Sequence, residues 1–295
     1  MKTFTEPQRT IPVIEADVFV AGAGTSGIAA AISAARSGAK VVLVEKLPVP
    51  GGTLTNGGIG FNAYYSQKTE NNESRRIVGG IAYELAQRLE ETGFSTGFRY
   101  VENDHYRTSY RFMADHEALK AVASEMLMEA GVTVLLQTFL ADVVSKDGTI
   151  EAAIIENKDG RSAVVAKQYI DATGDGDIPR RMGLEQLDLW QDYDKVCGGP
   201  TGLVFGMAGI DFDKAVKENG GAFRAMSEDQ GSEEGHLGMT RYAFAHAMKP
   251  ERYPRMCQLP INFFTSFQGI HEGEATYINN SKGVMCDASD AESLS

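Results

Sequence analysis

The sequence predicts an α/β protein in which a parallel sheet is extended by a three-stranded antiparallel meander. A strand, a helix and a second strand follow one another between residues 17 and 44, and such a βαβ unit builds a parallel sheet. Further along, Asp147-Gly148 and Asp159-Gly160 separate runs of β-branched residues, and Asp-Gly is typical of tight hairpin turns. These two observations fix the expected fold class.

The βαβ unit consists of three short segments. Asp17–Ala21 is an apolar strand, and the Ala-rich segment Ile28–Arg36 has a helical pattern that ends at Gly38. Val41–Val44 is a continuous aliphatic run, which is typical of a strand buried on both faces of a parallel sheet.

The rest of the predicted sheet lies beyond a second helix. Asp115 is expected to cap that helix, which ends before Gly131, and Val132–Thr138 is expected to form the next buried strand. After the meander, the strand Gln168–Ile170 closes on the sequence Asp-Ala-Thr-Gly-Asp-Gly-Asp, which starts at Asp171.

Gly22, Gly24 and Gly27 form a Gly-x-Gly-x-x-Gly fingerprint between the first strand and its helix. The first glycine allows a tight turn, the second lets the backbone approach a pyrophosphate, and the third lets the helix pack closely on the strand. Glu45 ends the second strand, where an acid accepts hydrogen bonds from a ribose diol. The fingerprint alone would also fit a simple packing joint, but the strands, helix and acid in register favour a Rossmann-like dinucleotide clamp.

A glycine-rich loop follows the clamp directly. Residues 47–62 hold five glycines and several small polar residues, whereas a nicotinamide-binding domain usually continues with another helix and strand. We therefore expect an extended ligand to lie under this loop.

Taken together, these motifs resemble the FAD-dependent oxidoreductases of the glutathione-reductase-like, two-dinucleotide-fold group. The resemblance is closest to the broad bacterial family called FAD-dependent oxidoreductases, which is related to the fumarate reductase flavoproteins. It covers Ala16 to about Gly183 and includes the Glu45-Lys46 pair, the glycine loop, the meander and the Ile170–Gly174 motif.

The resemblance implies a role for each matching residue. The fingerprint would hold the FAD pyrophosphate, Glu45 the adenosine ribose, and the Val143 backbone the adenine, while Thr173 and its neighbours would close over the dinucleotide. Because residues 44–60 contain no histidine, the FAD is expected to be held without a covalent bond to that loop. The implied cofactor-binding residues are Gly22, Gly24, Thr25, Ser26, Gly27, Glu45, Lys46, Gly51, Gly52, Thr53, Gly57, Gly58, Val143, Thr173, Gly174 and Asp175.

Residues 1–182 are expected to form the FAD-binding domain, and residues 183–295 an incomplete α+β substrate or cap domain. The second part lacks another βαβ fingerprint, so electrons are expected to come from a substrate or from a separate donor or acceptor. Members of the family are usually longer, and the chain is therefore expected to be truncated at its C-terminus. This leaves open a non-catalytic or split nucleotide-binding fragment.

Candidate catalytic residues lie in two segments. His105, Arg107 and Arg111 stand close together in the sequence, and His271 precedes a glutamate in the second domain. Arginine is suited to bind a carboxylate, and histidine to carry a proton. The alternative for the first segment is an edge hairpin with solvated charges. No metal site is expected, since the three cysteines are far apart and the acids after Asp171 lack the spacing of a calcium loop.

Composition limits the partners. A formal net charge of −12 without a basic stripe argues against nucleic acid, and no apolar run is long enough to cross a membrane, so a cytoplasmic protein is expected. The sequence is compatible with a homo-oligomer and does not determine the oligomeric state. The expected function is hydride transfer between flavin and a small organic substrate, with a carboxylate as one class. The alternatives are an NAD-linked dehydrogenase and the split fragment.

Overall fold

The computed structural model of the chain describes residues 8–58, 66–68, 74–95, 97–100, 110–112, 114–185, 204–209, 211, 224–225, 239–241, 265–268 and 275–279. The chain divides into two compact units. The first comprises Met1–Gly52 and Ser124–Gln186, and the second comprises Thr53–Ala123 and Leu187–Ser295. The assignment of residues 1–182 and 183–295 to two functional domains stays a prediction.

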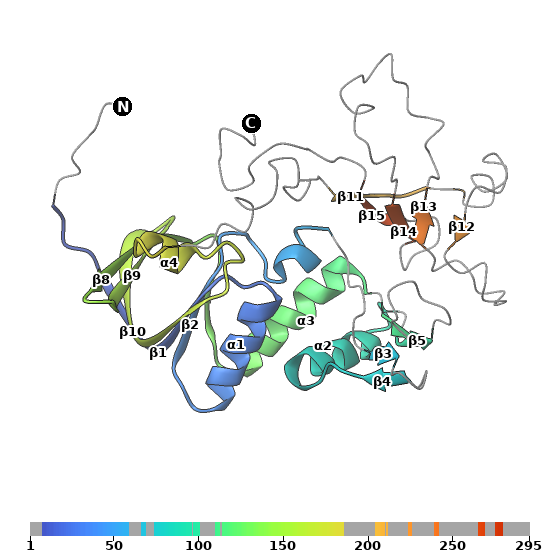
Figure 1. Ribbon diagram of the computed structural model, residues 1–295, viewed down its shortest axis with the longest axis horizontal. Coiled ribbons are helices and arrows are strands. Elements are labelled where there is room, and N and C mark those ends of the chain that lie inside the picture. The colour runs from blue at the N-terminus through green and yellow to red at the C-terminus, as the bar shows by residue number, and fades with distance from the viewer. Residues whose placement is uncertain are drawn as a thin grey trace, which may run out of the picture. The chain divides into compact units, whose positions relative to one another are not determined.

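The first unit contains a six-stranded mixed sheet with the strand order β7-β2-β1-β10-β9-β8. Strands β1, β2, β8, β9 and β10 of this sheet are labelled in Figure 1. The four strands from β7 to β10 pair in parallel, and β9 and β8 continue antiparallel. This confirms the predicted α/β class with a Rossmann-like sheet and an antiparallel meander. The strands are β1 (Val13–Ala21), β2 (Val41–Val44), β7 (Thr133–Leu135), β8 (Phe139–Lys146), β9 (Thr149–Asn157) and β10 (Gly160–Asp171).

The meander and the parallel sheet share strand β10. The predicted strand Gln168–Ile170 is the end of a single strand that begins at Gly160 and pairs antiparallel with β9 and parallel with β1. Strand β1 begins at Val13, not at Asp17 as the local pattern indicates, because its first residues pair with the meander half of β10, from Val13 opposite Ala163 onward.

Helix α1 (Thr25–Arg36) packs against β1, β2 and β10. Helix α3 (His116–Glu129) starts as predicted, because the Asp115 carboxylate accepts the N–H groups of Glu117 at 2.8 Å and Ala118 at 3.0 Å. The short helix α4 (Asp177–Arg181), which the sequence analysis did not predict, packs against β8.

One hydrophobic cluster joins the parallel strands to the meander. Phe19 and Ala21 point to the same face of β1, since alternate residues of a strand share a face. Every residue of β2 is buried, as predicted for a strand covered on both faces. The other members of the cluster are Val42, Val44, Leu140, Val143, Ala153, Ile155, Val164 and Ile178.

The second unit is described in separate pieces. The ring of Phe98 lies 5.8 Å from that of Tyr83 and 5.1 Å from that of Phe112, between centroids. The described strands of residues 204–279 form an antiparallel sheet with the order β11-β15-β14-β13-β12. The elements of this unit are β3 (Ser66–Lys68), β4 (Ser74–Arg76), α2 (Gly80–Glu91), β5 (Arg99–Tyr100), β6 (Tyr110–Arg111), β11 (Val204–Met207), β12 (Arg224–Ala225), β13 (Met239–Arg241), β14 (Thr265–Gln268) and β15 (Ala275–Asn279).

Candidate cofactor site

Two glycines of the fingerprint are required by the protein's own packing. Gly22 has a φ of +95°, and a Cβ atom on it would lie 2.5 Å from the carbonyl oxygen of Ala172. A Cβ atom on Gly27 would lie 1.8 Å from the carbonyl oxygen of Gly22. The turn between β1 and α1 therefore closes tightly against the end of β10, and no side chain fits at either position.

Gly24 has no such internal reason to be glycine. Its backbone, with φ −70° and ψ −174°, suits any residue, and no protein atom lies within 4 Å of a Cβ atom placed on it. Gly24 is the N-cap of α1 and provides no side-chain cap, so the first N–H groups of the helix have no partner within the helix. The position is open for a ligand to approach the backbone.

The glycine loop returns to this same point. The Gly51 N–H donates to the Ala23 carbonyl at 2.8 Å, and a Cβ atom on Gly52 would lie 3.0 Å from the Cα atom of Gly24. Two backbone segments thus converge beside Gly24 without side chains between them. Such a cradle suits the pyrophosphate of a dinucleotide, whose charge the free N–H groups at the helix start stabilise.

Glu45 holds the clamp together. This residue is 5% exposed, and its carboxylate accepts the Ala23 N–H at 2.7 Å and the Leu47 N–H at 2.9 Å. Each carboxylate oxygen has capacity for a further hydrogen bond. The predicted contact to a ribose diol stays a prediction, but the structure places the acid next to the fingerprint, as that role requires.

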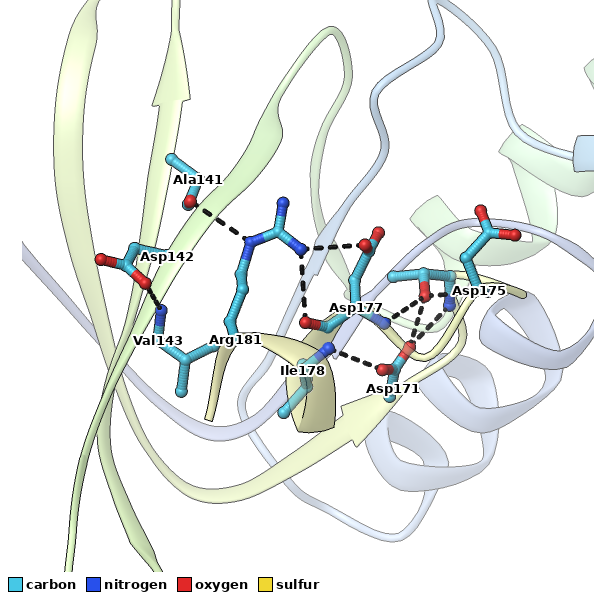
Figure 2. Close-up of polar contacts among 9 residues, drawn as sticks. Ala141, Asp142, Val143, Asp171, Asp175, Asp177, Ile178 and Arg181 are labelled. Carbon is cyan, nitrogen blue, oxygen red and sulfur yellow. Dashed lines mark hydrogen bonds and ion pairs between the residues drawn. The ribbon is translucent and has the colours of Figure 1, made fainter. Parts of the chain in front are cut away.

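The loop after β10 is organised by Asp171 (Figure 2). One carboxylate oxygen accepts the Thr173 N–H at 2.9 Å and the Thr173 hydroxyl at 2.7 Å, and the other accepts the Ile178 N–H at 2.8 Å. The Cα atom of Thr173 lies 3.1 Å from a Cβ atom placed on Gly22. Thr173 therefore lies against the fingerprint. That Thr173, Gly174 and Asp175 close over a dinucleotide stays a prediction.

The other predicted cofactor residues are placed less completely. Thr25 and Ser26 occupy the first turn of α1, and Lys46 is exposed beside Glu45. Thr53, Gly57 and Gly58 belong to the second unit, and their relation to the fingerprint stays a prediction.

The predicted catalytic residues are described only in part. His105, Arg107 and His271 lie outside the described residues. Arg111 lies in β6, opposite Arg99 of β5, in an antiparallel pair that agrees with the hairpin alternative.

The structure also reveals polar residues that the sequence analysis did not single out. The carboxylates of Asp171 and Asp177 serve the protein's own structure, Asp177 through an ion pair of 2.9 Å with Arg181. Among the described residues, no three His, Cys, Asp or Glu side chains gather as metal ligands would. An acid begins α4 and two arginines end it, but without a helical period these end residues do not predict a helix.

Fold and site together define an α/β protein with a dinucleotide clamp, and comparison with known proteins narrows the class. A family model described as FAD dependent oxidoreductase matches residues 17–294. The chain belongs to the FAD dependent oxidoreductase family, and its cofactor is FAD.

Individual relatives share parts of the chain. The thiamine thiazole synthase of Pyrococcus horikoshii is 30% identical over 171 residues, which cover 55% of this chain and 59% of that protein. The chain thus spans about three fifths of that relative's length. The fumarate reductase (cytochrome) of Shewanella frigidimarina is 46% identical over 62 residues, 21% of this chain and 10% of that protein.

Among solved structures, a geranylgeranyl bacteriochlorophyll reductase-like protein from Thermoplasma acidophilum superposes with a TM-score of 0.46 at 18% identity, covering 68% of this chain and 48% of that one. Within the part of the chain that the structure describes, no helix is both long and apolar enough to cross a membrane.

Proposed function

We propose that the chain is an oxidoreductase that transfers a hydride between FAD and a small organic substrate, with carboxylates as the favoured substrate class. The observation that carries the cofactor part is the open backbone at Gly24. It is a glycine that the protein's own packing does not require, at an uncapped helix start, with Gly52 close by. Membership of the FAD dependent oxidoreductase family supports the reaction class.

Different residues among those that the structure describes would bind different parts of FAD. The N–H groups of the first turn of α1, at Gly24, Thr25 and Ser26, would bind the pyrophosphate, and Glu45 would accept hydrogen bonds from the adenosine ribose. The Val143 backbone would meet the adenine. When bound, FAD supplies the hydride chemistry, while these residues hold and orient it.

The substrate end of the proposal rests on Arg107, Arg111, His105 and His271. The arginines would bind a substrate carboxylate, and a histidine would hold the proton that balances the hydride. The backbone pairing of β5 with β6 places Arg111 at the position facing Arg99.

The cofactor part is tested by substituting Gly24 and a matched glycine. Gly24→Val should lower the affinity for ADP and for FAD by about a hundredfold, because the branched side chain would fill the space reserved for the pyrophosphate. Gly79 is the matched control, since it too is an extended N-cap glycine with nothing within 4 Å of its Cβ position. Gly79→Val should leave both affinities unchanged.

Titration calorimetry with ADP, FAD and NADH separates the outcomes. Equal affinities in Gly24→Val and in the unsubstituted chain would mean that the fingerprint packs the helix on the strand and binds no nucleotide. Tight NADH binding without FAD binding would favour the NAD-linked alternative.

The reaction class is tested under anaerobic conditions on the chain loaded with reduced FAD. Unsaturated carboxylates should reoxidise the flavin, as followed by its visible absorbance, and the corresponding amides should do so more slowly. Arg111→Gln should remove that preference for carboxylates. A rate that is the same for acid and amide would contradict a carboxylate substrate.

A further inference from the structure

Strand β8 contains a bulge at the point where adenine recognition is proposed. Leu140 pairs with Ile155 and Asp142 with Ile154, so Ala141 is an extra residue in the ladder. The bulge explains why Leu140 and Val143 are both buried, at 8% and 7% exposed, although they are three positions apart. The core therefore fixes where the bulge lies.

The bulge leaves the main chain with groups that need other partners. The Val143 N–H donates to the exposed carboxylate of Asp142 at 2.8 Å, and Figure 2 shows that carboxylate pointing away from Arg181. An acceptor atom of a ligand could replace this carboxylate, because a bond to an exposed carboxylate can be exchanged for another without leaving a buried group unpaired.

Arg181 donates a hydrogen bond to the extra residue of the bulge, Ala141. Its Nε atom donates to the carbonyl oxygen of Ala141 at 3.2 Å, and its terminal nitrogen donates to the Asp177 carboxylate at 2.9 Å and to the Asp177 carbonyl at 3.3 Å (Figure 2). A planar guanidinium with several fixed donors orients all three acceptors at once. The peptide group between Ala141 and Asp142 is thereby kept from rotating.

The same residue connects the bulge to the loop beside the fingerprint. The Asp177 N–H donates to the Thr173 hydroxyl at 3.2 Å, and Thr173 is bound in turn by Asp171. Thr173 lies against Gly22, as described above. A continuous set of hydrogen bonds thus runs from the fingerprint turn to the edge of β8.

We propose that Arg181 is a positioning residue for base recognition, which fixes the bulged main chain of β8 so that the Val143 N–H reads the adenine ring. This inference rests on the proposed dinucleotide site. Adenine presents an acceptor at N1 beside its amino group, whereas hypoxanthine presents a donor at N1 beside a carbonyl oxygen. A fixed N–H at Val143 therefore favours ADP over inosine diphosphate, although both carry the same ribose and diphosphate.

The experiment compares ADP with inosine diphosphate by titration calorimetry on the full 295-residue chain. The unsubstituted chain should prefer ADP by about tenfold, the value of one well-placed hydrogen bond. Arg181→Met should reduce this preference to about twofold by weakening ADP more than inosine diphosphate, because only adenine accepts the Val143 N–H that Arg181 positions. Arg180→Met, an exposed neighbour that loses the same charge, should keep the full preference.

Each other outcome has a definite meaning. The proposed role of Arg181 would be overturned if Arg181→Met lowered the affinities for ADP and inosine diphosphate equally, or changed neither. It would also be overturned if the hydrogen-exchange rates of the Ala141–Val143 amides were unchanged in Arg181→Met. Absence of any binding to the unsubstituted chain would instead refute the proposed dinucleotide site.

Arg181→Lys provides a second variant, since an ammonium group retains the charge beside Asp177 but lacks the fork that reaches Ala141. It should lose the preference as Arg181→Met does. Both variants should fold, because Ile178, Leu140 and Val143 remain in the shared core. Loss of the fold in both, followed by circular dichroism, would also contradict the proposal.

Discussion

At the scale of single residues, the fingerprint glycines differ in what they are for. Gly22 and Gly27 are required by contacts within the protein, whereas the position of Gly24 is open. The fingerprint predicts these separate roles from the order of its glycines. The backbone geometry agrees with that order, since two of the positions are closed by protein atoms and the middle one is open.

Glu45 is expected to act on stability as well as on binding. Glu45→Ala would leave the Ala23 and Leu47 N–H groups without their acceptor, at a cost of about 1–3 kcal/mol in the free energy of unfolding. The affinity for ADP should fall by a comparable amount through the lost ribose contact. Urea denaturation without ligand and calorimetry with ADP measure the two effects separately. A loss of affinity with unchanged stability would show that the two hydrogen bonds contribute nothing to the fold.

At the scale of elements, the turn between β8 and β9 depends on left-handed backbone. Asp147 has a φ of +50° and Gly148 a φ of +78°, which suits a two-residue hairpin turn. Gly148→Val should lower the free energy of unfolding by about 1–2 kcal/mol, because a β-branched residue is strained there. Asp147→Gly should leave the free energy of unfolding nearly unchanged, because glycine adopts this backbone conformation readily. Thermal unfolding of both variants checks this, and an equal loss in the two would contradict it.

Helix α3 begins with a histidine whose pKa is lowered below 6.5 by burial. Asp115 and Glu117 raise the pKa of this imidazole and Lys120 lowers it, but burial dominates. Between the folded and unfolded pKa values only the unfolded chain binds the proton, so the free energy of unfolding falls as the pH drops below 6.5.

His116→Gln should therefore reduce the loss of stability between about pH 7.5 and about pH 5.5, since glutamine does not titrate. Urea midpoints at the two pH values, for both chains, provide the measurement. An equally large loss in the variant would assign the pH dependence to other groups.

The sequence predicts elements whose causes are local and misses those whose causes are distant. The Asp115 cap, the Asp-Gly turns and the aliphatic run of β2 could be read from neighbouring residues. The early start of β1 depends on pairing with β10, and the contact between Arg181 and Ala141 joins residues 40 positions apart. Helix α4, with 5 residues, is too short to show a helical period.

At the scale of the whole molecule, ligand binding should appear as thermal stabilisation. ADP at about a hundred times its dissociation constant should stabilise the native state by about 2.7 kcal/mol and raise the melting temperature of this 295-residue chain by about 4 °C. Gly24→Val, with its ADP affinity lowered about a hundredfold, should show a rise of less than about 1 °C at the same ADP concentration. Differential scanning fluorimetry measures both, and an equal rise in the variant would place the nucleotide elsewhere.

The pairing of β1 with β10 has a consequence for how the chain is made. Ala21 pairs with Asp171, 150 positions further along the chain, so one edge of β1 has no partner until β10 has left the ribosome. At usual rates of translation this takes roughly 8 to 30 s. During that time an apolar strand edge is open to other nascent chains, and the newly made protein should depend on chaperones more than its finished fold suggests.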